Sequence, residues 1–410
     1  MDTLLRAVLI VFCFKYAAFS DSPCTIELEC RECIPDNMPL VTSHRSENGT
    51  ITAAAGDEVV LVCSGGKFLA YPLRDTLTVV CKQGRYRVPH DGSLKHLIEL
   101  GCQENVFEDV LHEVAGCAPP LQGRAYQGAG GGRVAHVAAL CYDADRGLLR
   151  HAHLTAARGN DLRLPPHSHH TAPLTLLGNF NHMFDAKNRQ DAEMLYSDDA
   201  RLNRRLHELL KHEPHTFADQ TLTAVKLLSP HYFEDQNMRV TDFASNKAAV
   251  WRSVAAGNLL HLQRDVARAI RLTHSRAVAV VTGTQGVAEM RTGHHQTRLF
   301  LKAGERFPVP KYIWMVVVDY SRRRALAVVV LNDPFVAVSE IKEAVFCDSA
   351  CNAVNWIHEL KKNRNYETPV YGLAFCCSLQ NFTKVVTDVP SDLRMNISDF
   401  GVLTDLTSDE

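Results

Sequence analysis

The stretch Thr221-Leu-Thr-Ala-Val-Lys-Leu-Leu-Ser-Pro230 opens the part of the chain that decides the fold. Its alternating apolar pattern predicts a strand, which the proline ends. A polar loop leads to Asn246-Lys-Ala-Ala-Val-Trp251, and residues 254–272 then follow a helical pattern. Because apolar side chains recur every three or four residues there, we expect a long helix with one buried face.

The segments around this stretch complete the expected skeleton. The run Ala277-Val-Ala-Val-Val281 predicts a buried strand, and Thr282-Gly-Thr-Gln-Gly-Val287 predicts a glycine turn after it. Upstream, the leucines between residues 196 and 210 are spaced for a helix that covers a sheet. Strand, loop, helix and strand in this order predict an α+β fold with a mixed or antiparallel sheet and flanking helices.

The front of the chain has a different character. Residues 22 to about 145 read as short strands, such as Glu58-Val-Val-Leu-Val-Cys63 and Leu77-Thr-Val-Val-Cys81, separated by glycine and charged turns. No catalytic grouping stands out in them. We therefore expect a disulfide-rich β domain over residues 21–145 and a larger α+β domain over residues 146–410.

Residues 1–20 predict a secreted protein. Arg6 precedes an apolar run, and Ala18-Phe19-Ser20 offers small residues where a signal peptidase would cut. No later apolar stretch is long enough to cross a bilayer. We expect an extracellular chain that begins near Asp21, with no membrane partner.

Cysteine usage agrees with export. Removing Cys13 with the leader leaves an even set: Cys24, Cys30, Cys33, Cys63, Cys81, Cys102, Cys117, Cys141, Cys347, Cys351, Cys376 and Cys377. An even number in a secreted chain predicts disulfides; structural zinc at Cys30 and Cys33 is the alternative, but a second CxxC is missing. Adjacent cysteines pair with each other only under strain, so we expect Cys376 and Cys377 to bond to Cys347 and Cys351. Pairing among the first eight stays open.

Surface chemistry adds two expectations. Sequons at Asn48, Asn381 and Asn396 predict glycosylation. The formal net charge is only −2, so the chain has no general basic field for a polyanion, and any nucleic-acid site must be local. Arg204 and Arg205 are candidates for such a site, as is the run of residues 322–324, although solvated faces and turns also carry such runs.

A series of motifs along the chain resembles the DNA/RNA non-specific endonucleases, a family of ββα-metal nucleases. They occur in the family's order: Leu228-Ser-Pro230, Asn246 to Trp251, Val280 to Val287, Pro308-Val-Pro-Lys-Tyr312, Trp314, Asn332-Asp-Pro334, Cys347-Asp-Ser-Ala-Cys351 and Gly372-Leu-Ala-Phe-Cys-Cys377. The likeness is greatest to the secreted, cysteine-rich arthropod branch that includes gut double-stranded-RNA nucleases. The resemblance implies a ββα-metal nuclease-like domain that hydrolyses phosphodiester bonds with one Mg²⁺.

The same resemblance implies that the catalytic side chains have been lost. In the family a histidine at the end of the first strand takes a proton from water, and an arginine stabilises the phosphate charge. Leu227 stands at the histidine position, and Val225 at the arginine position. The metal-ligand asparagine falls on Ala255, and the helix glutamate falls on Gln263. A methyl group offers no oxygen to a hard cation.

Neighbouring residues supply candidate surrogates. His231 or His261 would replace the base, Lys226 the arginine, and Asn246 or Asn258 the metal ligand. Two hypotheses follow. The first is a secreted pseudonuclease that binds DNA or double-stranded RNA through Lys226, Asn246, Arg204 and Arg205, without cutting and without a cofactor. The second is an active Mg²⁺-dependent endonuclease with relocated catalytic residues.

Overall fold

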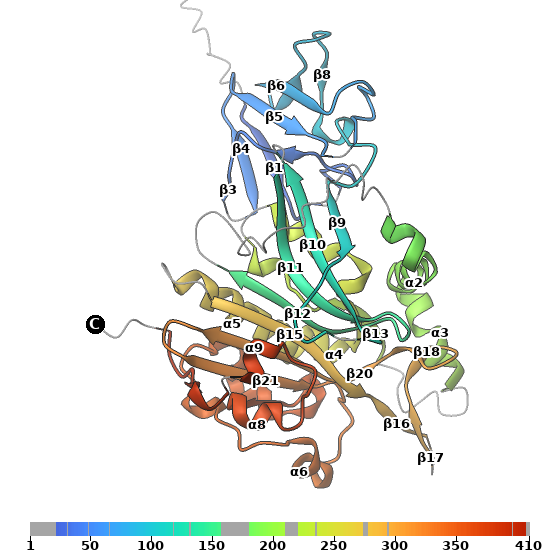
Figure 1. Ribbon diagram of the computed structural model, residues 1–410, viewed down its shortest axis with the longest axis vertical. Coiled ribbons are helices and arrows are strands. Elements are labelled where there is room, and N and C mark those ends of the chain that lie inside the picture. The colour runs from blue at the N-terminus through green and yellow to red at the C-terminus, as the bar shows by residue number, and fades with distance from the viewer. Residues whose placement is uncertain are drawn as a thin grey trace, which may run out of the picture.

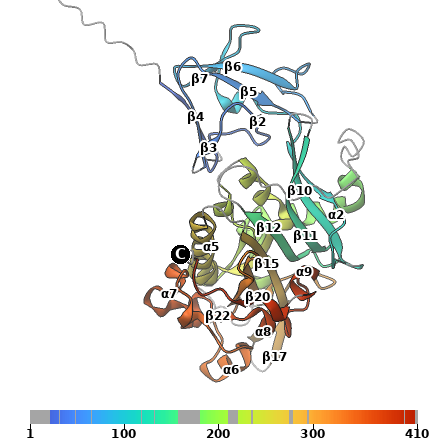
Figure 2. The ribbon, with the colours of Figure 1, turned by 60° about the vertical axis from the view of Figure 1, so that its left-hand side comes forward.

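The computed structural model describes residues 22–30, 32–47, 49–64, 66–117, 119–130, 133–156, 180–209, 220–233, 236–273, 278–292, 295–395 and 397–406. The expected signal peptide, Asn48 and Asn396 lie outside these ranges. Figure 1 shows a small β region at one end of an elongated molecule and a larger α+β body at the other. The long strands β10 and β11 reach from the body toward the β region (Figures 1 and 2).

The β region holds two antiparallel sheets. One consists of β1 (Cys24–Glu27), β4 (Thr50–Ala53) and β3 (Ser46–Glu47). The other, in spatial order, consists of β2 (Leu40–Val41), β5 (Glu58–Val62), β6 (Thr76–Lys82), β7 (Arg85–Arg87) and β8 (Leu94–Lys95). Three disulfides hold these short strands together: Cys24–Cys81, Cys30–Cys33 and Cys63–Cys102. The structure therefore has a disulfide where zinc was the alternative.

The body is organised on a nine-stranded sheet. Its order is β22 (Ala374–Cys377), β21 (Arg324–Leu331), β20 (Pro310–Asp319), β15 (Val278–Val287), β12 (Leu148–Ala156), β11 (Arg133–Asp143), β10 (Gln122–Gly130) and β9 (Phe107–Leu111), with β23 (Gly401–Val402) paired to β21. The chain is thus a mixed α+β protein. The expected domain boundary at residue 145 falls inside this sheet, between β11 and β12.

The central strands are buried on both faces, which explains their continuous apolar runs. In β20, Ile313, Met315 and Val317 belong to one core cluster, and Trp314 and Val316 belong to the other. The alternation follows from the two-residue period of a strand. One layer contains α5, and the opposite layer contains α8 and α9 (Figure 1).

The same alternation explains the C-terminal disulfides. Cys376 lies in the first core cluster and Cys377 in the second, so their side chains point to opposite faces of β22. Cys376 bonds to Cys351, and Cys377 bonds to Cys347. The expected partners of the adjacent cysteines are confirmed. With Cys117–Cys141, all twelve cysteines after residue 20 are paired.

The segment quoted first forms a two-stranded antiparallel sheet followed by a helix. Strand β13 (Leu222–Lys226) pairs with β14 (Lys247–Trp251), with Leu222 opposite Trp251. Then come α4 (Arg252–Val254), the π turn η5 (Ala255–Leu259) and α5 (Leu260–Leu272). The strand and the helix expected within residues 221–272 are confirmed, and residues 247–251 form a second strand that was not predicted.

One local expectation is wrong, because residues 282–287 are not a turn but the second half of strand β15. A Cβ at position 283 would overlap the carbonyl oxygen of Arg150 on β12 and the indole of Trp314 on β20. Gly283 is therefore required by close packing between neighbouring strands. A glycine in a strand interior marks such a close approach as well as a turn.

The remaining elements are short apart from two helices. The α-helices are α2 (Phe180–Tyr196), α3 (Asp199–Leu209), α6 (Ile341–Ala344), α7 (His358–Lys361), α8 (Leu379–Thr383) and α9 (Ser391–Met395). The 3-10 turns are η1 (Leu97–Glu99), η2 (Pro230–Tyr232), η3 (Gln236–Asp242), η4 (Ala244–Asn246), η6 (Val338–Glu340), η7 (Cys351–Ala353), η8 (Lys362–Glu367), η9 (Pro369–Tyr371) and η10 (Ile397–Asp399). Two hairpins complete the fold: β16 (Glu289–Thr292) with β17 (His295–Arg298), and β18 (Phe300–Lys302) with β19 (Arg306–Pro308).

Candidate functional site

Leu227, at the position expected for the catalytic base, lies directly after β13 and is fully buried in the larger core cluster. Its backbone N–H donates to the carbonyl of Asn246 at 2.9 Å. The strand end is thereby fixed against the turn before β14. At this position the protein has a packed alkyl side chain, which can neither accept a proton nor reach a solvent-borne phosphate.

Asn246, a candidate ligand for metal or nucleic acid, is also fully buried. Its Oδ1 accepts from the N–H of Leu228 at 2.8 Å. Its Nδ2 donates to the carbonyls of Leu228 at 3.0 Å and Thr241 at 2.9 Å. These bonds join the segment just after β13 to η3 and to η4, the turn before β14. The contacts support a structural role for the amide, since both of its polar atoms are engaged with backbone.

The helix start is distorted where the family resemblance expects the metal ligand. Ala255 is half-buried against the core, and Gly257 leaves helical geometry with φ −95° and ψ −122°. A Cβ at position 257 would stand 2.8 Å from the Tyr371 carbonyl oxygen, so only glycine allows this contact. One residue further on, Asn258 is fully buried, and its Nδ2 donates to the carbonyls of Asn365 and Gly372 at 2.8 and 2.6 Å.

Gln263, at the position expected for the helix glutamate, connects α5 to the first strand. Its Nε2 donates to the carbonyl of Lys226 at 2.8 Å. The Lys226 ammonium pairs in turn with the Asp242 carboxylate at 2.7 Å. Lys226, the candidate replacement for the family's arginine, is therefore already paired with a carboxylate. Val225 beside it is half-buried and packs against the core.

The two candidate bases lie on neighbouring elements, because η2, which contains His231, packs against α5, which contains His261. The His231 backbone N–H donates to Ser229 Oγ at 3.3 Å. The Nδ1 of His261 is buried and has no hydrogen-bond partner among the described residues. Of the two candidate bases, His261 is the one with a buried and unpartnered ring nitrogen among the described residues.

An acid that the sequence reasoning overlooked lies on the same helix. Asp265 is buried, and its carboxylate accepts the N–H groups of Glu359 at 2.9 Å and Leu360 at 2.8 Å. Burial raises the pKa of this carboxyl, against the lowering effect of the two backbone hydrogen bonds. The bonds cap the first turn of α7, so we interpret Asp265 as a helix cap. Its position amid an apolar helix face was the available signal.

The residues at this centre do not fit a hydrated Mg²⁺. Such an ion retains several waters and takes carboxylate or carbonyl oxygens. Leu227 and Ala255 supply none, and the amides of Asn246 and Asn258 are fully buried. The Asn258 Oδ1 is unpartnered within the described part of the chain, but its own amide nitrogen fixes it against Asn365 and Gly372. A single buried oxygen cannot coordinate a hydrated cation.

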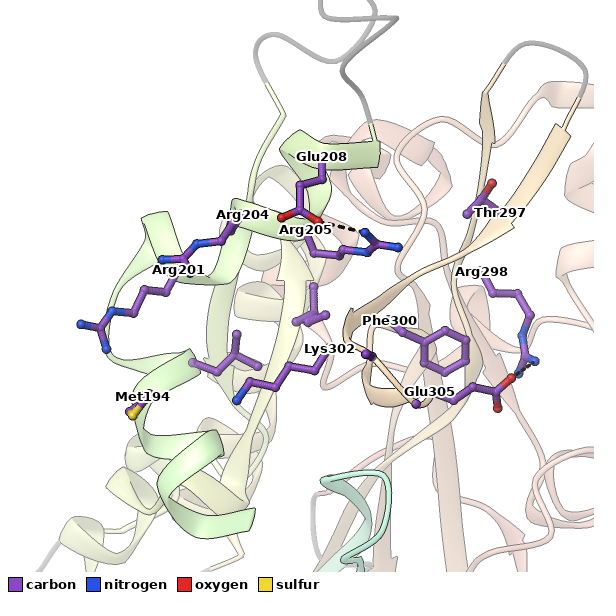
Figure 3. A pocket seen from close by; sticks show the side chains of 14 residues that line it. Met194, Arg201, Arg204, Arg205, Glu208, Thr297, Arg298, Phe300, Lys302 and Glu305 are labelled. Carbon is purple, nitrogen blue, oxygen red and sulfur yellow. Dashed lines mark hydrogen bonds and ion pairs between the residues drawn. The ribbon is translucent and has the colours of Figure 1, made fainter. Parts of the chain in front are cut away.

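The two arginines expected to bind nucleic acid lie elsewhere. Arg204 and Arg205 stand on α3 and line a pocket of about 790 Å³, whose opposite wall is formed by residues 297–305. Figure 3 shows Arg205 extending from α3 toward that wall and Lys302 extending from that wall toward α2. The basic side chains of the pocket are those of Arg201, Arg204, Arg205, Arg298 and Lys302, and the acidic ones are those of Glu208 and Glu305.

Ion pairs occupy only part of this positive charge. Arg205 pairs with Glu208 at 2.9 Å, and Arg298 pairs with Glu305 at 3.6 Å. Lys302 pairs with Asp191, which lies outside the pocket lining. The Arg204 guanidinium has no carboxylate partner among the residues that the structure describes. By contrast, Arg322 in the other basic run is paired to both Asp319 and Asp405.

The remaining predicted site, the sequon at Asn381, lies on α8. The side chain is half-buried, and its Oδ1 accepts from the Lys384 ammonium at 3.1 Å. Glycosylation there stays a prediction. Among the described residues, no group of three or more His, Cys, Asp or Glu side chains is arranged to hold a metal ion. Within those residues, too, no helix is long and apolar enough to cross a membrane.

Comparisons with known proteins give a distant likeness. No protein-family model matches the chain. The chain is 26% identical over 158 residues to "Salivary protein Tsal1" from Glossina morsitans morsitans. That match covers 38% of this chain and 37% of the Glossina protein, so the likeness spans little more than a third of either sequence. The chain is therefore similar, over that part, to a protein described as salivary.

Proposed function

We propose that this chain is a secreted pseudonuclease: it keeps a ββα-metal nuclease-like frame and binds nucleic acid without hydrolysing it. The carrying observation is the state of the expected catalytic centre. Leu227 is fully buried where the base would stand, and Gln263 donates to the Lys226 backbone where a carboxylate would face the hydrated metal. The positions are built into the core.

Magnitudes favour an inactive protein. General-base catalysis contributes about 10²- to 10⁴-fold in rate, and metal-ion stabilisation adds several kcal/mol. The position of the base is taken by an alkyl group and that of the metal ligand by a methyl group. A chain without both retains little hydrolytic capacity, whereas phosphate binding needs only cations and remains available through surface arginines.

Secretion is supported by independent features. Six disulfides join all twelve cysteines after residue 20, and disulfides persist in oxidising compartments. The distant relative is described as a salivary protein, which is consistent with export. Both observations agree with the leader predicted for residues 1–20.

A second candidate function is an active Mg²⁺-dependent endonuclease with relocated residues. The observation in its favour is the unpaired Nδ1 of His261, on the helix that packs against η2 and His231. An imidazole whose buried nitrogen has no partner among the described residues is a chemically competent base. Asn258 is the weakest part of this second hypothesis, because its buried amide already donates to two backbone carbonyls.

The test compares cleavage with binding on the same purified protein. RNA and DNA, each in duplex and single-stranded form, are incubated with Mg²⁺ and then with EDTA, and binding is measured at low salt. We expect binding of at least one polymer and no cleavage. Cleavage that EDTA stops, and that His231→Ala or His261→Ala abolishes, would establish the second function instead. Failure to bind either polymer would overturn the nucleic-acid part of the proposal.

A further inference from the structure

The pocket between α3 and residues 297–305 is separate from the expected catalytic centre. Helix α3 is joined to the start of β13, since the Leu222 N–H donates to Asn203 Oδ1 at 2.7 Å and Asn203 Nδ2 donates to the Leu222 carbonyl at 2.8 Å. Leu227 follows the other end of that strand. A five-residue strand spans about 13 Å. Helix α3, and with it the pocket, is therefore joined to the opposite end of β13 from Leu227.

Both walls of the pocket carry cations. Arg201, Arg204 and Arg205 line the pocket from α3, and Figure 3 shows Arg205 extending toward the hairpin while Arg201 and Arg204 extend toward the other side of the view. Arg298 and Lys302 line the hairpin side, where Arg298 extends toward Glu305 (Figure 3) and Lys302 pairs with Asp191 of α2. Against two carboxylates, five cations leave a formal excess of three positive charges. Arg201 is only loosely paired, at 4.0 Å from Asp198.

The pocket also offers an apolar surface. Its lining includes Met194, which is 53% exposed, and the half-buried ring of Phe300, over which the Arg298 guanidinium lies at 5.1 Å. A partly exposed aromatic ring and a guanidinium plane are groups on which unstacked bases lie, while surrounding arginines bind phosphates. The volume of about 790 Å³ is within the range of about 300–1,000 Å³ typical of ligand sites.

We infer that this pocket binds a single-stranded segment of nucleic acid, with phosphates on the α3 arginines and a base against the Phe300 side. The inference rests on the proposed function and gives it a location and a preferred ligand. A single strand is flexible and can enter a hollow between two walls. A duplex carries its phosphates on a rigid outer surface and meets fewer of these cations together.

The experiment removes two of the cations and compares a variant of equal charge. Arg204→Ala/Arg205→Ala is set beside Arg87→Ala/Arg364→Ala, whose arginines are exposed and lie away from the pocket lining. Affinity for a labelled single-stranded oligonucleotide is measured over a salt series. Each phosphate contact to a single strand contributes about 0.7 to the slope of log affinity against log salt. We expect the pocket variant to reduce the slope by about 1.4 and the affinity roughly tenfold or more, and the control variant to match the wild type.

The outcomes separate this inference from the function on which it rests. If the wild type binds no nucleic acid, the proposed function fails. If it binds and both double variants bind equally well, the pocket assignment alone is overturned. Duplex and inorganic polyphosphate serve as competitors. Competition by either as strong as that by the single strand would overturn the single-strand assignment, and weaker competition by both would support it.

Discussion

The side-chain amide nitrogen of Gln263 lies 2.8 Å from the backbone carbonyl oxygen of Lys226 and donates a hydrogen bond to it. This bond ties helix α5 to the end of the strand that the family resemblance makes catalytic. A glutamate at the same position could not donate while ionised. The Gln263 amide therefore donates a structural hydrogen bond. The ionised glutamate that the family resemblance places at this position could not donate it.

Gln263→Glu should destabilise the protein at neutral pH, because the new carboxylate would face a carbonyl oxygen with no donor between them. Leaving a buried polar group unsatisfied costs about 1–3 kcal/mol. Urea unfolding at pH 7 measures the loss, and Gln380→Glu, on an exposed face of α8, is the matched control. Equal stability of the two variants would show that the hydrogen bond does not matter.

Leu227→His should not restore a base but should weaken the core. The leucine is fully buried, so the change removes apolar burial and places a polar ring among apolar neighbours. We expect a loss of about 2–5 kcal/mol in the free energy of unfolding, against less than about 1.5 kcal/mol for Leu227→Met. Combining it with Val225→Arg, Ala255→Asn and Gln263→Glu should yield no cleavage of RNA or DNA. Cleavage by that quadruple variant would contradict the buried centre.

Asn258→Asp should unfasten the C-terminal segment from the start of α5. The substitution removes the donor to the Asn365 and Gly372 carbonyls and buries a charge, which costs about 3 kcal/mol or more. Limited proteolysis should then cut near residues 362–373 earlier than in the wild type. The control is Asn105→Asp, where the exposed side chain only accepts a hydrogen bond. Stabilisation of the Asn258 variant by millimolar Mg²⁺ would instead indicate a metal ligand.

Acid should destabilise the protein through His151. Its ring is buried in β12, with Nδ1 bonded to the Asp388 carbonyl at 2.9 Å, and burial lowers its pKa to about 4. The unfolded chain binds the proton first, near pH 6.5, so the stabilisation is complete above that pH and is lost as the pH falls toward about 4. The shift corresponds to roughly 3 kcal/mol.

Other charged and titratable groups surround His151, so the pH dependence needs a control variant. Arg150 pairs with Asp388, the half-buried His153 has its own pKa lowered by desolvation, and Arg394 disfavours the charged ring of His151. His151→Asn keeps a donor but does not titrate. Unfolding free energies measured from pH 7 to pH 4 should fall less steeply in that variant. An identical slope would show that another group governs the acid response.

The sequence alone predicted those features that depend on local periodicity. The alternation of residues 221–230, the helical spacing of residues 254–272 and the apolar run at 277–281 each became an element of the expected type. The partners of Cys376 and Cys377 followed from the strain of bonding neighbours, and the two-sided strand places the pair on opposite faces. Such patterns lie within a few residues, where backbone geometry sets side-chain direction.

Only the tertiary structure decided what the singled-out residues do. Gly283 was predicted to lie in a turn. It lies in strand β15, where the Arg150 carbonyl oxygen and the Trp314 indole leave no room for a Cβ atom. Asn246, Asn258 and Gln263 had polar atoms suited to a site, but backbone carbonyls from distant segments occupy their amides. The pocket arises because α3 and residues 297–305, far apart in sequence, pack against each other. A side chain's role depends on which distant groups exclude water from it and form hydrogen bonds with it. Local sequence patterns do not reveal which distant groups those are.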